Sequence, residues 1–264
     1  MEELIQTGLA PFSRSTLEDA ARVSFLHRFD TKFVMRSDGV PAFLHAVKDD
    51  YSVLEINGVA AQSYNTVYFD TPDLLCFNLH HNQRANRFKF RTRKYLSNGK
   101  IYNEIKQKIN TGKTIKFRQR RDEFNIEPPI LPAQNDLAAF DGHFEALLRT
   151  NGYGFVGHLA PSLHVFFNRV TFLNKRFAER MTLDLGLRYA YGGVSLLLND
   201  SAIIELKREK GPEHTVAQDY FRSIHKTPSG FSKYTIGISL THEEAKKNRF
   251  LPRIKHLAYE RSAA

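Results

Sequence analysis

Basic and apolar residues alternate with a period of two along residues 87–108. Every second position from Arg87 to Arg93 is basic, and Glu104, Lys106 and Lys108 form a second alternating set. The positions between them include phenylalanine and isoleucine residues. Successive side chains of a β-strand point to opposite faces of the sheet. The pattern therefore predicts two strands, each with one charged face and one face that can pack against a core.

The dipeptide Asn98-Gly99 lies between the two sets and is a strong signal for a hairpin turn. With these two residues at the centre of the turn, the expected pairs are Arg93–Glu104, Arg91–Lys106 and Lys89–Lys108. Like charges directly opposite each other destabilise a sheet. The charged face therefore either looks into bulk water, as a solvated edge, or lines a cavity that holds something strongly negative.

The same combination of a charged and an apolar face recurs along the chain. Further strands are expected at residues 27–35, 114–124, 163–173, 176–185 and 201–209, and a hairpin at 51–69. Helices are expected at about 37–48, 71–80, 134–149 and 212–225, and from residue 241 onward. No repeat or linker interrupts residues 1–264, which favours a single domain.

Several strands with one cationic face suggest closure of the sheet. A closed antiparallel barrel, with helices packed on its outside, would bury the apolar faces and surround a charged interior. Such an interior is most stable when a polyanion fills it, because cations a few ångströms apart repel one another. The expected fold is therefore α+β, a closed barrel with external helices.

Composition supports an anionic partner. The 264 residues carry a formal net charge of +10, which favours nucleic acid, anionic lipid or a phosphate-rich small molecule. The one cysteine, Cys76, excludes an intrachain disulfide. The N-terminal residues lack the features of a signal peptide, and no apolar run approaches the ~20 residues of a membrane span. A cytoplasmic location is expected.

Acidic residues among the bases add a second kind of chemistry. Glu104, Glu205 and Asp184 are oxygen donors of the type that a hard divalent cation requires. Phosphates, a divalent metal and an arginine cage together are the components of phosphoryl transfer.

The chain resembles the catalytic domain of the VTC (vacuolar transporter chaperone) family, the polyphosphate polymerase branch of the triphosphate tunnel metalloenzymes. The resemblance extends from about Leu26 to about Gly237. It rests on the ordered fragments HRFDTKFVM, TVYFDT, RFKFRTRKY, YNEIKQK, NRVTF, RMTLD, IIELK and FSKY. The first fragment carries Asp30 where glutamate is commoner, which leaves the role of this position open.

The resemblance implies an eight-stranded antiparallel tunnel, Mn²⁺ or Mg²⁺ as cofactor, and a set of site residues. The residues in catalytic positions are Arg91, Arg93, Lys106 and Arg169. The residues in phosphate-binding positions are Lys32, Lys89, Arg180, Lys207 and Lys233. Glu205 is the expected metal ligand, with an ion pair to Lys207 or to an arginine of a neighbouring strand as its alternative role. Glu104 is expected to pair with Arg93.

Three functions follow. The first is a metal-dependent polyphosphate polymerase that transfers the γ-phosphate of ATP to a growing polyphosphate chain. The second is a tripolyphosphatase or nucleoside triphosphatase, with water as the acceptor. The third is a non-catalytic module that binds polyanions. ATP or another triphosphate and inorganic polyphosphate are the expected partners, and nucleic acid is not expected, because Phe88 and Phe90 face away from the cations. The sequence does not show whether a membrane partner exists.

Overall fold

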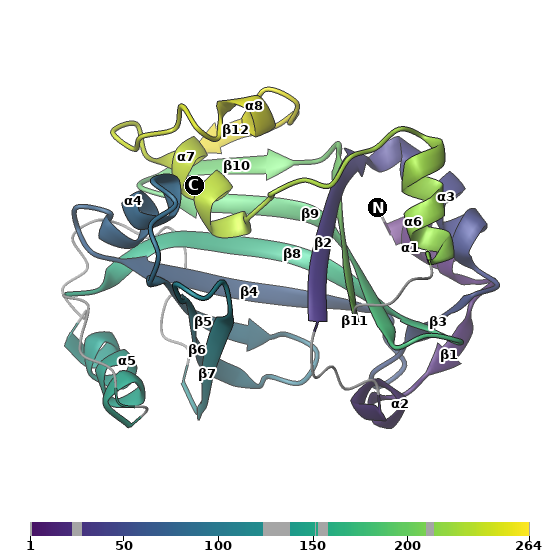
Figure 1. The fold of residues 1–264 in the computed structure, drawn as a ribbon, viewed down its shortest axis with the longest axis horizontal. Helices are drawn as coiled ribbons and strands as arrows, with labels where there is room; N and C mark the ends of the chain where they lie inside the picture. The colour runs from purple at the N-terminus through teal and green to yellow at the C-terminus, as the bar shows by residue number, and fades with distance from the viewer. Residues whose placement is uncertain are drawn as a thin grey trace. The chain divides into compact units, whose positions relative to one another are not determined.

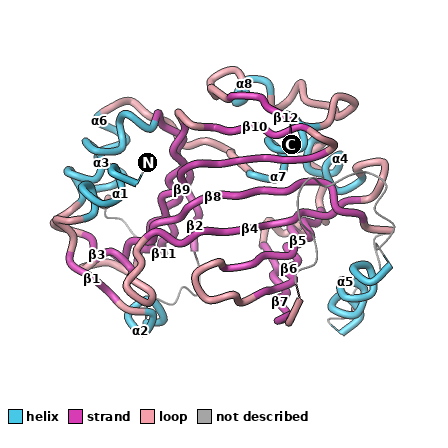
Figure 2. Tube along the Cα trace, turned by 180° about the vertical axis from the view of Figure 1, so that it is seen from behind, coloured by secondary structure: helices cyan, strands magenta, loops and turns pink. Residues whose placement is uncertain are grey.

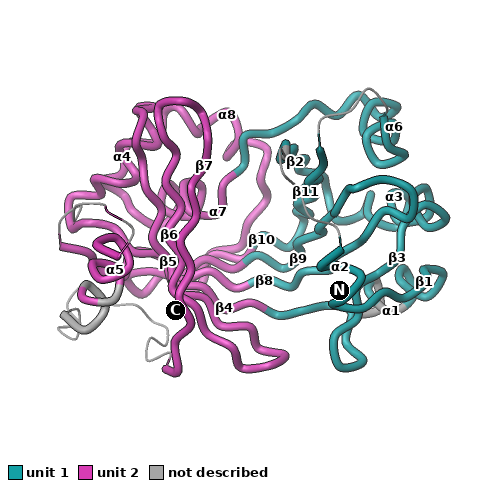
Figure 3. The backbone as a smooth tube through the Cα atoms, turned by 60° about the horizontal axis from the view of Figure 1, so that its bottom comes forward, with its two compact units in different colours: residues 1–63, 167–187, 198–231 teal, residues 64–166, 188–197, 232–264 magenta. Residues whose placement is uncertain are grey.

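The computed structural model describes residues 2–22, 28–123, 138–150, 152, 158–209 and 214–263. The chain divides into two compact units, which Figure 3 distinguishes by colour. Unit 1 comprises Met1–Ser63, Phe167–Leu187 and Leu198–Phe231, and unit 2 comprises Tyr64–Phe166, Arg188–Leu197 and Ser232–Ala264. Residues 134–137, the first four of the helix predicted at 134–149, lie outside the described residues.

The helices and strands follow the chain in the order labelled in Figure 1. The helices are α1 (Glu2–Leu9), α2 (Leu17–Arg22), η1 (Ser37–Gly39), α3 (Val40–Val47), α4 (Leu75–His81), α5 (Ala138–Thr150), α6 (Val216–Ser223), α7 (Lys233–Thr241) and α8 (Leu251–Ile254). The strands are β1 (Ser13–Ser15), β2 (Arg28–Arg36), β3 (Tyr51–Leu54), β4 (Ala61–Asp70), β5 (Arg87–Tyr95), β6 (Ile101–Lys108), β7 (Thr114–Arg121), β8 (Ala160–Asn174), β9 (Glu179–Tyr191), β10 (Val194–Leu198), β11 (Ser201–Glu209) and β12 (Glu260–Ala263).

In unit 1 the strands β2, β11 and β9 are antiparallel neighbours, and β3 pairs with β1 and with β8. One face of these strands is apolar and packs against α1, α3 and α6, which gather on one side in Figure 1. Phe33, Ile204 and Leu183 contribute to this core, and Phe33 stacks on Phe221 of α6 at 3.9 Å between ring centroids. Alternation then places the residues in between on the opposite face.

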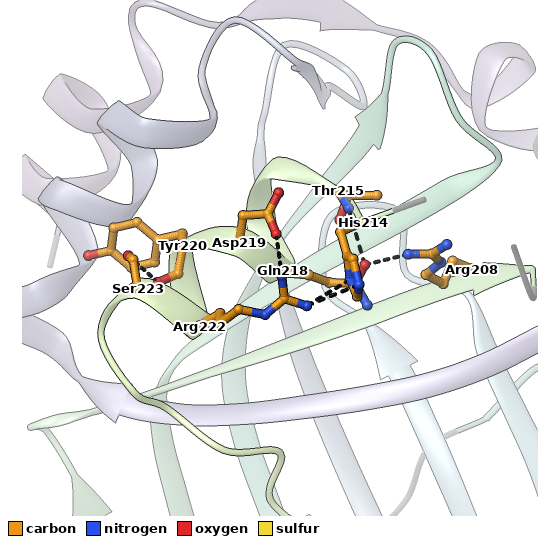
Figure 4. Close-up of polar contacts among 8 residues, drawn as sticks. All are labelled: Arg208, His214, Thr215, Gln218, Asp219, Tyr220, Arg222 and Ser223. Atoms are coloured by element: carbon orange, nitrogen blue, oxygen red, sulfur yellow. Dashed lines mark hydrogen bonds and ion pairs between the residues drawn. The ribbon is translucent and has the colours of Figure 1, made fainter. Parts of the chain in front are cut away.

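The helix α6 is tied to the end of β11 by polar contacts (Figure 4). Thr215 and Gln218 form a capping box, which satisfies backbone N–H groups at the start of the helix. The guanidinium group of Arg208 donates to the Gln218 side chain, and Arg222 contacts Asp219 and His214. The contact of Arg208 with Gln218 joins the start of α6 to β11, the strand that carries Glu205 and Lys207.

In unit 2 the strands β4, β5, β6 and β7 form consecutive antiparallel pairs. Figure 2 shows the last three of these strands side by side from the back. Their apolar face contributes Phe90 and Ile105 to a core completed by Phe144 and Leu148 of α5. The assignment of β5 and β6 to one apolar and one charged face is confirmed.

The prediction of a closed eight-stranded barrel is wrong. The described residues form an open, largely antiparallel sheet of 12 strands, in which the pairing of β1 with β3 is parallel. Within the described residues, β7 pairs only with β6, and β2 pairs only with β11. These strands are therefore edges of the sheet. Alternation identifies the two faces of a strand, but it does not tell whether the first and last strands of a sheet meet.

Two local predictions also fail. The segments predicted as a hairpin at 51–69 are β3 and β4, but within the described residues these two strands are not paired with each other, and the turn between them contains an isolated bridge of Ile56 with Val59. β3 pairs instead with β1 and β8. The C-terminal helix predicted from Thr241 onward is wrong: α7 ends at Thr241, where His242 has an extended backbone, and the described residues beyond it contain only the four-residue helix α8.

Candidate functional site

The pairing of β5 with β6 differs from the expected hairpin by two residues. Arg91 lies opposite Glu104, and Lys89 lies opposite Lys106. The reason is a longer loop, in which the Tyr95 N–H donates to the Lys100 carbonyl oxygen at 2.9 Å. A shift of two residues leaves every side chain on its predicted face, whereas a shift of one would have reversed them.

A row of three lysines crosses the charged face of unit 2. Lys89, Lys106 and Lys116 occupy directly opposed positions on β5, β6 and β7. We refer to these three residues as the lysine row. Lys116 was not among the predicted site residues, although the alternation of basic residues in its strand contained the signal. Like charges in adjacent positions destabilise the sheet unless negative charge compensates them, so this row is suited to a polyanion.

The next row along the same strands is an ion-paired arrangement. The Nη2 and Nε atoms of Arg91 lie 2.5 and 2.6 Å from Glu104 Oε2, and Arg118 Nε lies 3.5 Å from Glu104 Oε1. The predicted partner of Glu104 was Arg93, which lies opposite Tyr102 instead. Burial alone would raise the pKa of Glu104, but attraction to Arg91 and Arg93 outweighs it and lowers the pKa to about 2. Glu104 is therefore ionised at neutral pH.

Arg93 is more enclosed than the prediction of a catalytic role suggests. It is 6% exposed. Its Nε donates to Thr66 Oγ1 at 3.1 Å, and its guanidinium group lies 5.2 Å from the centroid of the Tyr64 ring.

The start of α7 lies beside the lysine row. Ser232 is the N-cap of this helix, and its hydroxyl accepts hydrogen bonds from Thr235 N–H and from Lys89 Nζ, the latter at 2.9 Å. Lys233 is the first residue of the helix. Tyr234 donates from its hydroxyl to the buried carboxylate of Asp70, which anchors the helix to the end of β4. This brings the Ser-Lys pair of the FSKY fragment to the same region as Lys89.

Unit 1 carries a second ionic cluster. Glu205 Oε1 lies 3.1 Å from Lys32 Nζ on β2, and Glu205 Oε2 lies 2.7 Å from Lys207 Nζ on its own strand. Burial would raise the pKa of Glu205, but attraction to Lys207, Lys32 and Arg169 holds it well below its usual range. Burial also lowers the pKa of Lys207, although Glu205 opposes this shift. The predicted metal ligand is thus an ionised carboxylate between two ammonium groups.

Arg169 and Arg180 belong to the same charged face of unit 1. Arg169 forms a bidentate pair with Asp184, with distances of 2.5 and 2.7 Å. Arg180 lies opposite Lys207 in the pairing of β9 with β11. Its guanidinium group donates to the carbonyl oxygen of Ala20, which directs one end of the side chain toward α2.

The described residues contain no group of three or more His, Cys, Asp or Glu side chains able to hold a metal ion. Magnesium is commonly bound by one or two carboxylates together with the phosphates of a substrate, and not by a cage made of protein alone. Glu205 fits that requirement, because it is ionised and its oxygens share a face with basic side chains. In the part of the chain that the structure describes, no helix combines the length and apolar character needed to cross a membrane.

The chain was compared with protein families and with solved structures. The sequence model of the VTC domain matches residues 27–242. Among curated proteins, nothing matches the chain. Solved structures with a similar fold include a proposed adenylate cyclase from Vibrio parahaemolyticus, with 14% identity over 81% of this chain and 99% of that chain and a TM-score of 0.39.

Two further structures give similar values. A proposed adenylyl cyclase from Hippeastrum, described as having a dominant triphosphatase activity, is 16% identical over 81% of this chain and 97% of that chain, with a TM-score of 0.46. A proposed adenylate cyclase from Bacillus halodurans is 16% identical over 85% of this chain and 97% of that chain, with a TM-score of 0.43.

Proposed function

The chain belongs to the VTC domain family, and from that premise we propose that it is a metal-dependent phosphotransferase acting on triphosphates. In this proposal it binds ATP and inorganic polyphosphate and transfers the γ-phosphate of ATP to the end of a growing polyphosphate chain.

The lysine row is the observation that carries the proposal. Three ammonium groups on adjacent strands, with the N-terminus of α7 beside Lys89, form a site suited to several linked phosphates. Arg91 adds a planar guanidinium group one row further along. A single phosphate or carboxylate would neutralise only part of this charge, so a triphosphate or polyphosphate is the better match.

The acceptor follows from the state of the carboxylates. Hydrolysis benefits from a carboxylate that orients the attacking water. Glu104 and Asp184 form close ion pairs with Arg91 and Arg169, and Glu205 is assigned to the metal in this proposal, so none of these three orients a water molecule. Transfer to polyphosphate needs no general base, because the attacking phosphate oxygen is already anionic. This favours phosphate as the acceptor.

Residue roles in the proposal divide between the two units. In unit 2, Arg91 and Lys106 stabilise the transferring group, and Lys89 and Lys233 hold the phosphate chain. The enclosed Arg93 adds positive charge to the site without itself contacting phosphate. In unit 1, Arg169 has the catalytic role, and Lys32, Arg180 and Lys207 bind phosphate. Glu205 would hold Mg²⁺ or Mn²⁺, which neutralises phosphate oxygens and polarises the phosphoryl group when it is bound.

The test is to incubate the purified full chain with ATP and Mn²⁺ and to measure both products. A gel resolves long polyphosphate, and a colorimetric assay measures free phosphate. Polyphosphate chains support the proposal, and they are expected to be lost in K106M but retained in K100M, whose lysine lies in the exposed hairpin loop. Phosphate release without chains would show a triphosphatase instead. Binding of ATP that is independent of metal, without turnover, would show a non-catalytic polyanion module.

A further inference from the structure

Tyrosines occupy the end of the charged face of unit 2 that lies beyond the Arg91 row. Tyr64 on β4, Tyr95 on β5 and Tyr102 on β6 share this face with the lysine row, as the pairing of the strands requires. The Tyr64 and Tyr95 ring centroids lie 5.0 Å apart, and those of Tyr95 and Tyr102 lie 5.9 Å apart. Sequence reasoning missed this feature, because it considered only the phenylalanines on the opposite face.

Arg118 packs against this group of tyrosines. Its guanidinium carbon is 3.5 Å from the centroid of the Tyr102 ring and 5.6 Å from that of Tyr95. Its Nη2 donates to the Tyr95 hydroxyl at 3.0 Å, which fixes the plane of the group. The Arg118 side chain nevertheless remains 47% exposed. A planar cation held against one aromatic ring therefore keeps part of its surface available to a second planar group.

The spacing along the strands connects this group to the lysine row. On β6, Tyr102 is four residues from Lys106 on the same face, which corresponds to about 13 Å of strand. On β7, Arg118 is two residues from Lys116. A nucleoside triphosphate that lies along the strands with its phosphates on the lysine row would therefore place its nucleoside next to the tyrosines.

We propose that Arg118 and Tyr102 form the subsite for the nucleobase of the triphosphate substrate. The base stacks on the exposed part of the Arg118 guanidinium group, which Tyr102 supports from below. Stacking of this kind accepts any base with a π-face and favours the larger purines, so ATP and GTP are expected to bind alike. The inference rests on the proposed function, because it takes the lysine row as the site of the phosphates.

The experiment compares two ligands that differ only in the nucleoside. Dissociation constants for ATP and for inorganic tripolyphosphate, both with Mg²⁺, are measured by calorimetry on the full chain. R118K keeps the charge near Glu104 but loses the planar group, and Y102L keeps an apolar side chain but loses the ring. We expect each variant to raise the dissociation constant of ATP about tenfold and that of tripolyphosphate by less than twofold. R253K is the matched control, since Arg253 also lies over an aromatic ring, that of Phe250, 5.9 Å from its centroid.

The outcomes separate this inference from the proposed function. If the unaltered protein binds neither ligand, the proposed function fails. If it binds both and the two variants leave ATP affinity unchanged, or weaken both ligands equally, the nucleobase subsite is wrong. A variant that weakens the binding of a single-stranded RNA oligonucleotide tenfold more than the binding of ATP would also overturn the subsite. Arg118 and Tyr102 would then bind nucleic acid.

Discussion

The guanidinium group of Arg169 binds both oxygens of the Asp184 carboxylate, with Nε at 2.5 Å from Oδ1 and Nη2 at 2.7 Å from Oδ2. The two side chains are 16% and 2% exposed. A buried bidentate pair of this kind fixes the orientation of the arginine. If Arg169 binds phosphate as proposed, it does so through the part of the guanidinium group that does not contact Asp184.

We expect D184N to lower the free energy of unfolding by about 3 kcal/mol, because it leaves the buried Arg169 without its charged partner. Inorganic tripolyphosphate should restore part of this loss if Arg169 binds phosphate, and it should therefore stabilise D184N more than the unaltered protein. Urea unfolding with and without tripolyphosphate measures both effects. D38N is the control, since Asp38 pairs with Arg36 on the exposed surface, and its effect should stay within about 0.5 kcal/mol. Equal stabilisation of D184N and the unaltered protein by tripolyphosphate would remove Arg169 from the phosphate site.

Lys116 provides a prediction in which stability and binding change in opposite directions. K116M removes one of three opposed positive charges, so the free energy of unfolding of the ligand-free protein should rise by about 0.5 kcal/mol. The same substitution should weaken the binding of tripolyphosphate about tenfold, because a charged contact to phosphate is lost. Thermal unfolding and calorimetry test the two effects, with K100M as a control expected to change neither. Weaker binding without a gain in stability would mean that the lysine row is already compensated by neighbouring groups in the free protein.

The charged and apolar faces could be predicted from sequence because they depend only on the alternation along each strand. Glu205 and Lys207 share one face of β11, and Ile204 and Leu206 lie in the core on the other. The expected strand at 201–209 is confirmed as β11. Such local patterns survive folding, because a strand half buried against helices has few alternative arrangements.

The remaining features depend on contacts that the alternation does not contain. The pair Arg91–Glu104 replaced the expected pair Arg93–Glu104, because the backbone contact between Tyr95 and Lys100 lengthens the loop. The structure has an open sheet and not the expected barrel. The alternation could not predict this, because closure depends on hydrogen bonds between strands that are far apart in sequence. The approach of Ser232 to Lys89 links residues 143 positions apart.

Glu104 predicts a stability change at acidic pH. The pKa of this group is about 2 in the folded protein, below the ordinary value of 4.5. Its contribution is therefore complete above pH 4.5 and is lost as the pH falls toward 2, by about 3 kcal/mol in total. E104Q should be less stable than the unaltered protein at pH 7, and the difference should shrink between pH 4.5 and pH 2. Urea unfolding across this range measures it, with the exposed Glu18 in E18Q as the control. A difference that stays constant from pH 7 to pH 2 would contradict the lowered pKa.

Tyr234 provides the last prediction, which concerns how the start of α7 is held. The buried Asp70 carboxylate accepts hydrogen bonds from the N–H groups of Thr71, Cys76 and Phe77 at 2.8, 2.8 and 2.9 Å, and from the Tyr234 hydroxyl. Y234F removes one of these four bonds and keeps the ring. We expect the free energy of unfolding to fall by about 2 kcal/mol, as is typical of a bond to a charged group.

Tyr234 lies directly after the N-cap Ser232 and Lys233 at the start of α7. The same variant should therefore also weaken the binding of tripolyphosphate, by a factor of about three. Y259F serves as the control, since Tyr259 is 45% exposed and its loss should change neither quantity. If Y234F loses stability but binds tripolyphosphate as tightly as the unaltered protein, the start of α7 does not take part in phosphate binding. The lysine row would then hold the phosphates without help from the helix.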